Sequence, residues 1–216
     1  MYVLADLEWF EDKTKRICFT QISMRRVYDR WSSFYHFYRR IQPLPSSFPD
    51  WSHVSFTGGP SVAFLRAQNE AQVFQELKRW LWPSDIICWW KSDAMELFKK
   101  RVPSIVNKQV ALSDLVANYL EDDPHKTPYQ FGISLSLEYL GPEHDARNNT
   151  EMMRRVLERI NFPQPIPEYV PNLDKYCGGQ DLIQTMAYHL HTPTNIIHKN
   201  GHLQHFAMPV FYLIFF

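Results

Sequence analysis

The chain has 216 residues, the size of one domain with a small appendage. Its 23 Lys and Arg residues balance 23 Asp and Glu residues, which excludes a generally basic protein that coats nucleic acid and an acidic disordered tail. A local basic groove is not excluded. Hydrophobic residues make up 45% and aromatic residues 15%, so a packed core is expected. No GxGxxG or GxxxxGK(S/T) pattern occurs, which argues against a glycine-rich phosphate-binding loop.

The N-terminal residues, the length of the apolar runs and the cysteines together predict a soluble, cytoplasmic protein with no membrane contact. The acids Asp6 and Glu8 fall where a signal peptide would be apolar. The longest apolar run, residues 206–216, is shorter than the about 20 residues of a spanning helix. The cysteines are few, far apart and without a CxxC pair, which favours a reducing compartment: Cys18, Cys88 and Cys177.

The first third of the sequence predicts an antiparallel meander. Residues 2–9, 16–23 and 30–38 are rich in branched and aromatic residues and are separated by short turns.

The middle of the sequence predicts helices around one buried strand. Asn69 is placed to cap a helix over residues 69–82, and residues 85–90 form the strand, with a helix opening at Ser92 or Asp93. Further helices are expected over these ranges: 113–120, 135–140 and 143–161. This order predicts an α/β fold of the RNase H-like type, with a three-strand antiparallel meander plus parallel strands in one mixed sheet flanked by helices.

Three segments are predicted along the chain. Residues 1–161 form the main domain, and residues 162–175 form a proline-rich linker. Residues 176–216 form a small appendage with five of the nine histidines, for which surface or packed histidines are expected ahead of a zinc site. Its apolar end is expected to pack on the main domain, on a second copy of the chain or on a protein partner.

Two acids near the N-terminus carry the main chemical signal. Asp6 and Glu8 are two residues apart on a predicted strand, so both carboxylates lie on the same face. Adjacent buried carboxylates repel each other unless they share a cation. A divalent metal site and a solvated strand face are the two alternatives.

Three later residues complete a pattern of known type. Asp93 follows the fourth predicted strand, and His144 opens a His-x-Ala-x-x-Asn sequence that ends at Asn149. With Asp6-x-Glu8, this order resembles the DEDDh 3′–5′ exonucleases, the DnaQ-like relatives of a proofreading subunit, over residues 1 to about 161. The segments 19–22 and 53–58 support the resemblance.

The resemblance implies a site and a mechanism. Asp6, Glu8, Asp93 and the residue at position 149 would bind two Mg²⁺ or Mn²⁺ ions. His144 would be the general base that takes a proton from the attacking water. The substrates would be 3′ ends of single-stranded DNA or RNA.

The sequence departs from the family pattern at two places. Asn149 stands where the family has Asp, so the group loses a charge. Trp9 and Phe10 follow Glu8 where relatives often have small residues; either could stack on a base, worth about 1–3 kcal/mol, while core packing is expected for at least one. Two functions therefore stay open: a metal-dependent 3′–5′ exonuclease impaired by Asn149, or an inactive exonuclease fold that binds nucleic acid or protein.

Arginines gather on the second and third predicted strands and on the last helix. A groove that tracks a nucleic-acid backbone and a solvated face are equally good interpretations. The residues concerned are Arg25, Arg26, Arg30, Arg39, Arg40, Arg147, Arg154, Arg155 and Arg159.

Overall fold

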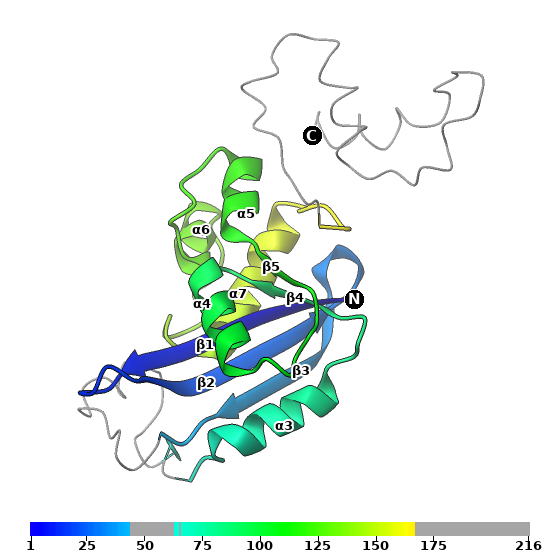
Figure 1. Ribbon diagram of the computed structural model, residues 1–216. Helices are drawn as coiled ribbons and strands as arrows, with labels where there is room; N and C mark the ends of the chain where they lie inside the picture. The colour runs from blue at the N-terminus through cyan, green and yellow to red at the C-terminus, as the bar shows by residue number, and fades with distance from the viewer. Residues whose placement is uncertain (44–62, 65, 167–216) are drawn as a thin grey trace, which may run out of the picture. The chain divides into compact units, whose positions relative to one another are not determined.

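A computed structural model describes residues 1–43, 63–64 and 66–166, and its core is one five-stranded mixed sheet (Figure 1). The strands are β1 (Tyr2–Glu11), β2 (Ile17–Val27), β3 (Ser33–Arg40), β4 (Ile86–Trp89) and β5 (Gln109–Ala111). Their order is β3-β2-β1-β4-β5; β2 is antiparallel to β1 and β3, whereas β4 is parallel to β1 and β5. The predicted fold class is confirmed.

Helices cover both faces of the sheet. They are α3 (Glu70–Trp80), α4 (Ser92–Arg101), α5 (Ser113–Leu120), α6 (Pro128–Ser134) and α7 (Ala146–Arg159), with a 3-10 turn η1 (Asp29–Trp31). Side chains of α3 and α4 pack into the main core on one face, whereas α7 lies against β1 and β2 on the other (Figure 1). The α7 helix therefore sits where it can reach the polar side chains of β1.

The alternation of β1 decides which of its residues face each layer. Val3, Ala5 and Leu7 are buried in the core beneath α3 and α4. Because successive side chains of a strand point to opposite faces, Asp6 and Glu8 face α7 instead. Both acids thus lie on one face of the sheet, as the spacing predicts.

Local signals explain most of the element boundaries. The Asn69 side chain accepts a hydrogen bond from the Gln72 N–H, and the Gln72 side chain caps in return, so α3 begins where the sequence predicts. The helix predicted over 135–140 is wrong. An equivalent cap at Thr127 starts α6 earlier, and the chain leaves it at Ser136, whose φ is +56°. β5 was not predicted, because its three residues are too few for a period to show.

The main domain extends at least to Phe162, whose carbonyl accepts a hydrogen bond of 2.9 Å from the Trp31 indole N–H. The Phe162 ring also contacts Trp31 and Tyr119. Residues 167–216 lie outside the described residues, so the linker over 162–175 and the appendage over 176–216 stay predictions. Within the part of the chain that is described, no helix is both long and apolar enough to cross a membrane.

A buried ion pair ties β2 to the segment before β4. Arg26 donates from Nη2 to Asp85 Oδ2 at 2.7 Å, with side chains only 4% and 0% exposed. The guanidinium also lies over the rings of Trp80 and Trp82, at 4.3 and 4.1 Å from their centroids. These contacts neutralise a charge that burial would otherwise make costly.

We expect Asp85→Ala to lower the free energy of unfolding by about 3–5 kcal/mol, because it leaves Arg26 buried without a counter-charge. Glu96→Ala is the matched control: it breaks the exposed Lys99–Glu96 pair, which is worth about 0–1 kcal/mol. Urea denaturation measures both. Equal losses in the two variants would contradict the role given to Asp85.

Candidate active site

The centre of the site is a hydrogen-bonded group of three side chains from β1 and α7. The amide Nδ2 of Asn149 donates to Asp6 Oδ2 and to Glu8 Oε1, both at 2.9 Å. Asn149 lies in the first turns of α7, whose N-cap residue Asp145 accepts the N–H of Arg147. This amide orientation is the one that gives both carboxylates a donor, since the reverse would place Oδ1 against them.

The amide oxygen of Asn149 is the least satisfied atom of the group. Asn149 Oδ1 is buried and has no hydrogen-bond partner within the described part of the chain. An unpaired buried acceptor costs about 1–3 kcal/mol. The two hydrogen bonds to the carboxylates therefore stabilise the group by more than the unpaired amide oxygen costs.

The two carboxylates hold a proton at neutral pH. Burial raises the pKa of Asp6 to about 6 against the effect of the Asn149 hydrogen bond. Burial, and then the charge of Asp6, raises the pKa of Glu8 to about 9. The pair therefore holds a shared proton more tightly than free carboxylates do as long as no cation is bound.

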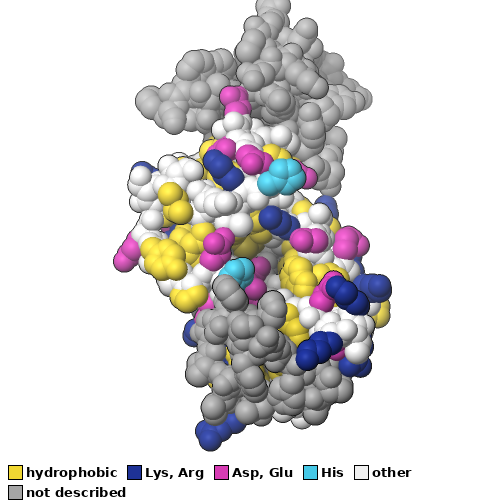
Figure 2. All heavy atoms as spheres, turned by 90° about the vertical axis from the view of Figure 1, so that its left-hand side faces the viewer, with side chains coloured by type: hydrophobic (Ala, Val, Ile, Leu, Met, Phe, Trp, Pro, Cys, Tyr) yellow, Lys and Arg dark blue, Asp and Glu magenta, His cyan; other side chains and the backbone are white. Residues whose placement is uncertain are grey.

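His144 lies beside this group, in the loop before α7. Its Nδ1 is 3.7 Å from Glu8 Oε2, too long for a hydrogen bond, and its side chain is 58% exposed. The face of the molecule at this end of β1 is hollowed near its centre, with acidic, histidine and hydrophobic side chains around the hollow (Figure 2). The imidazole is thus placed to reach a ligand that enters beside the carboxylates.

The structure does not bring Asp93 into the group. Asp93 is exposed in the first turn of α4, where its Oδ1 accepts the N–H of Ala94 at 2.8 Å. Among the described residues there is no group of three or more His, Cys, Asp or Glu side chains able to hold a metal ion.

The two aromatic residues after Glu8 are both half-buried. Trp9 packs against the main core, next to a register shift between Glu8 and Trp9. This agrees with the expectation that at least one of the two is a core residue. Contact of Trp9 or Phe10 with a base stays a prediction.

These residues do not fit a centre for two divalent ions. Two dications bring four positive charges, whereas this group offers two carboxylates and one neutral amide. Asn149 presents N–H groups, not oxygen, to the space between the carboxylates. Hard cations such as Mg²⁺ need oxygen ligands there.

One positioning residue escaped the sequence analysis. Gln21 of β2 pairs with Glu8 in the sheet and is fully buried. Its Oε1 accepts the Tyr38 hydroxyl at 3.1 Å, and its Nε2 donates to the carbonyl of His144 at 3.5 Å. The signal was a polar residue inside an apolar strand, two positions before buried Ser23. Gln21 therefore helps to hold the loop that carries His144.

The raised pKa of Glu8 predicts a pH-dependent stability. The folded state keeps a proton that the unfolded chain releases near its ordinary pKa of 4.5, so stability falls as pH rises from there through about 9. Glu8→Gln removes this proton, and we expect its stability relative to the wild type to rise by at least about 1.4 kcal/mol between pH 5 and 9. Urea denaturation across this range measures the difference, with exposed Glu96→Gln as control. Parallel curves for wild type and Glu8→Gln would disprove it.

Comparison with known proteins agrees on the fold. No family model matches the chain, and no curated relative matches its sequence. Among solved structures, the nuclease domain of 3′hExo, a DEDDh family member bound to rAMP, has a TM-score of 0.62 at 14% identity, over 74% of this chain and 90% of that one.

Two further structures give similar values. A 3′-exonuclease described by its 3′-end specific recognition of a histone mRNA stem-loop has a TM-score of 0.62 at 12% identity, over 74% of this chain. E. coli exonuclease I in complex with a dA16 oligonucleotide has 0.59 at 16% identity, over 76% of this chain. The match spans 62% and 41% of those two chains, less than two thirds of each. At such identities the likeness concerns architecture: the chain has the RNase H-like fold found in DEDDh-type 3′-exonucleases.

Proposed function

We propose that this protein binds the 3′ ends of single-stranded DNA or RNA beside Asp6 and Glu8, and that it hydrolyses them slowly or not at all. The observation that carries the proposal is the Asn149 amide, which donates to both carboxylates at 2.9 Å. Of the two functions that the sequence leaves open, this geometry favours the inactive binding fold over the metal-dependent exonuclease.

The charge of the group supports weak hydrolysis. The resemblance implies four acidic ligands for two Mg²⁺ or Mn²⁺ ions, but Asn149 is neutral and Asp93 is exposed on α4. His144 is 3.7 Å from Glu8 and makes no strong ion pair with it. A water molecule at this group would therefore lack most of the activation that the family mechanism requires.

The same charge state supports binding of a nucleic-acid end. A phosphate that approaches two ionised carboxylates meets two negative charges, whereas here it meets about one. Protonated Glu8 can donate a hydrogen bond to a phosphate oxygen or a terminal hydroxyl. Structures of the same fold that bind rAMP, a stem-loop and dA16 support this class of ligand.

End binding is tested with labelled strands that differ only in their ends. By fluorescence anisotropy, a linear single strand with a free 3′ hydroxyl should bind at least about tenfold more tightly than a closed circle of equal length, because only the linear strand offers a terminal group to Glu8 and His144. Asp6→Arg should reduce the preference for linear strands, because the larger side chain blocks the space beside Glu8 and Asn149. Equal affinity for linear and circular strands would refute end binding.

Asn149→Asp tests the role of the amide. Without metal, the third carboxylate replaces a shared donor, so we expect a loss of at least about 1–3 kcal/mol in unfolding free energy. With Mn²⁺, the variant should recover stability and bind the ion at least about tenfold more tightly than the wild type. Asn148→Asp is the matched control, because its side chain bonds to the carbonyl of Pro142 instead of the carboxylates.

A degradation assay then separates the two functions. If the exonuclease apparatus is otherwise intact, Asn149→Asp should raise the rate on single-stranded DNA or RNA by at least about tenfold, and adding His144→Ala should abolish the gain. If Asn149→Asp is as inert as the wild type with Mg²⁺ and with Mn²⁺, the enzyme hypothesis fails and end binding remains.

A further inference from the structure

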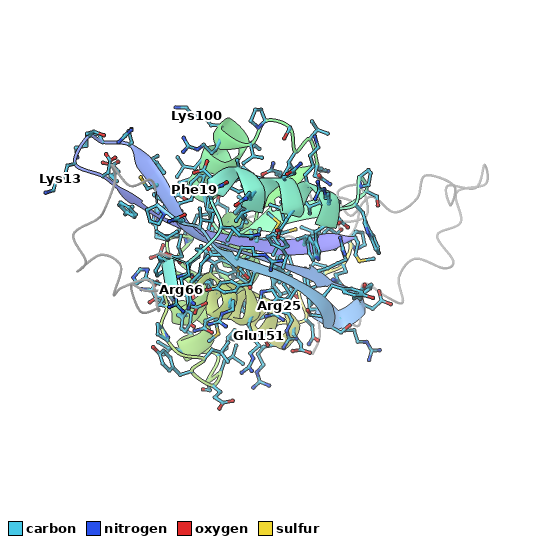
Figure 3. The ribbon with its side chains drawn as sticks, turned by 90° about the horizontal axis from the view of Figure 1, so that it is seen from below. Lys13, Phe19, Arg25, Arg66, Lys100 and Glu151 are labelled. Atoms are coloured by element: carbon cyan, nitrogen blue, oxygen red, sulfur yellow. The ribbon has the colours of Figure 1, made fainter. Side chains whose placement is uncertain are left out.

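A basic groove lies on the opposite face of the sheet from α7. It has a volume of about 530 Å³ and runs between the β1–β2 hairpin and the second half of α4. Phe19 and Leu97 contribute to its apolar floor. Its walls are basic, with Lys15 and Arg16 from the hairpin and Lys100 and Arg101 from α4. Phe19, Lys100 and the hairpin residue Lys13 lie toward the same end of the molecule (Figure 3).

The charges around this hairpin groove favour an anionic ligand. Three of its basic residues have acidic partners that do not line it: Lys15 pairs with Glu11 at 3.3 Å, Arg16 with Asp12 at 3.1 Å and Arg101 with Glu70 at 3.0 Å. The Lys15–Glu11 pair is exposed and worth about 0–1 kcal/mol, so a phosphate can compete for Lys15. Arg16 and Arg101 are held more firmly, by the buried carboxylate of Asp12 and by a bidentate contact with Glu70.

Lys100 gives the groove an uncompensated charge. It makes no ion pair or hydrogen bond with any described residue, and no carboxylate lines the groove. Its neighbour Lys99 differs, since it pairs with Glu96 at 2.9 Å and lies outside the groove.

The groove begins close to the carboxylate group. Phe19 pairs with Trp9 in the sheet, and Trp9 follows Glu8 directly. One residue of a strand spans about 3.3 Å, so Glu8 and the floor of the groove are adjacent along β1, with Glu8 on one face of the sheet and the groove on the other. The pairing of β1 with β4 ends at Ala5, so no strand among the described residues pairs with that edge of β1 from Asp6 onward. A chain leaving the site can cross this open edge.

We infer that the hairpin groove binds the phosphodiester backbone of the single strand whose 3′ end lies at Asp6 and Glu8. This inference rests on the proposed function and adds the path of the strand. Basic walls over an apolar floor are the surface that single strands use, with phosphates on Lys and Arg and bases against apolar side chains. Lys and Arg side chains gather beside the hollow on the face shown in Figure 2. An acidic peptide is the competing ligand, but it has no reason to end at the carboxylates.

Lys100→Glu tests the groove, with Lys99→Glu as the matched control one residue away. Affinities are measured for single strands of about 4 and about 12 nucleotides, since only the longer one can span both places. We expect Lys100→Glu to weaken the longer strand at least about fivefold and to lower its salt slope by about 0.7, the value of one phosphate contact. The short strand and the Lys99→Glu variant should bind like the wild type.

The outcomes separate the groove from the end site. Equal affinities of Lys100→Glu and Lys99→Glu for the longer strand overturn the groove while end binding stands. Failure of the wild type to bind either strand overturns the end site and the groove together. Binding of poly-glutamate that depends on Lys100 and exceeds that of the longer strand also overturns the inference. Equal melting temperatures of the two variants exclude misfolding as the cause of a loss.

Discussion

The contact on which the site depends is the bridge from one amide to two carboxylates. Asp6 and Glu8 share a strand face, so the α7 helix can pack there only if their charge is met. Asn149 meets it with two hydrogen bonds, and a retained proton removes most of the remaining repulsion. A neutral amide thus does in the folded protein what a shared cation would otherwise do. The same contact that holds α7 on β1 makes the group a poor host for two dications.

Site residues whose position follows from the regular repeat of a strand could be predicted from the sequence. A residue whose position depends on the exact boundary between a strand and a helix could not. A strand repeat of two put Asp6 and Glu8 on one face, and the family resemblance put Asn149 with them. Asp93 depends instead on where β4 ends and α4 begins. If the start of α4 moves by one residue, a side chain turns by about 100° around the helix axis, enough to move a carboxylate from a cleft to solvent. Gln21 was overlooked because a polar residue inside an apolar strand does not show which distant loop it supports.

The arginine clusters show a second limit of sequence analysis. Counted along the chain, they suit a nucleic-acid groove, but the sequence does not show which acids lie opposite them. In the structure Arg26 is held by Asp85, Arg39 by Glu76, and Arg154 by Glu151 and Glu158. The pairs of Arg26 and Arg39 join different segments of the fold, whereas those of Arg154 lie within α7. Lys100 of α4, which lines the hairpin groove, belongs to none of the clusters that the sequence singled out.

The proton on Glu8 links the site to whatever binds there. A ligand phosphate disfavours the ionised carboxylate, so an anion bound beside Glu8 raises the pKa of that group further. By linkage, loss of the Glu8 proton must weaken binding of the anion by the same free energy. A nucleic-acid end bound as proposed would therefore be held most tightly where Glu8 stays protonated. A metal-dependent exonuclease would instead require an ionised Glu8 carboxylate, because a metal ligand must be ionised. An anion and a divalent cation therefore shift this pair in opposite directions: the anion favours its protonated form, and the cation favours its ionised form.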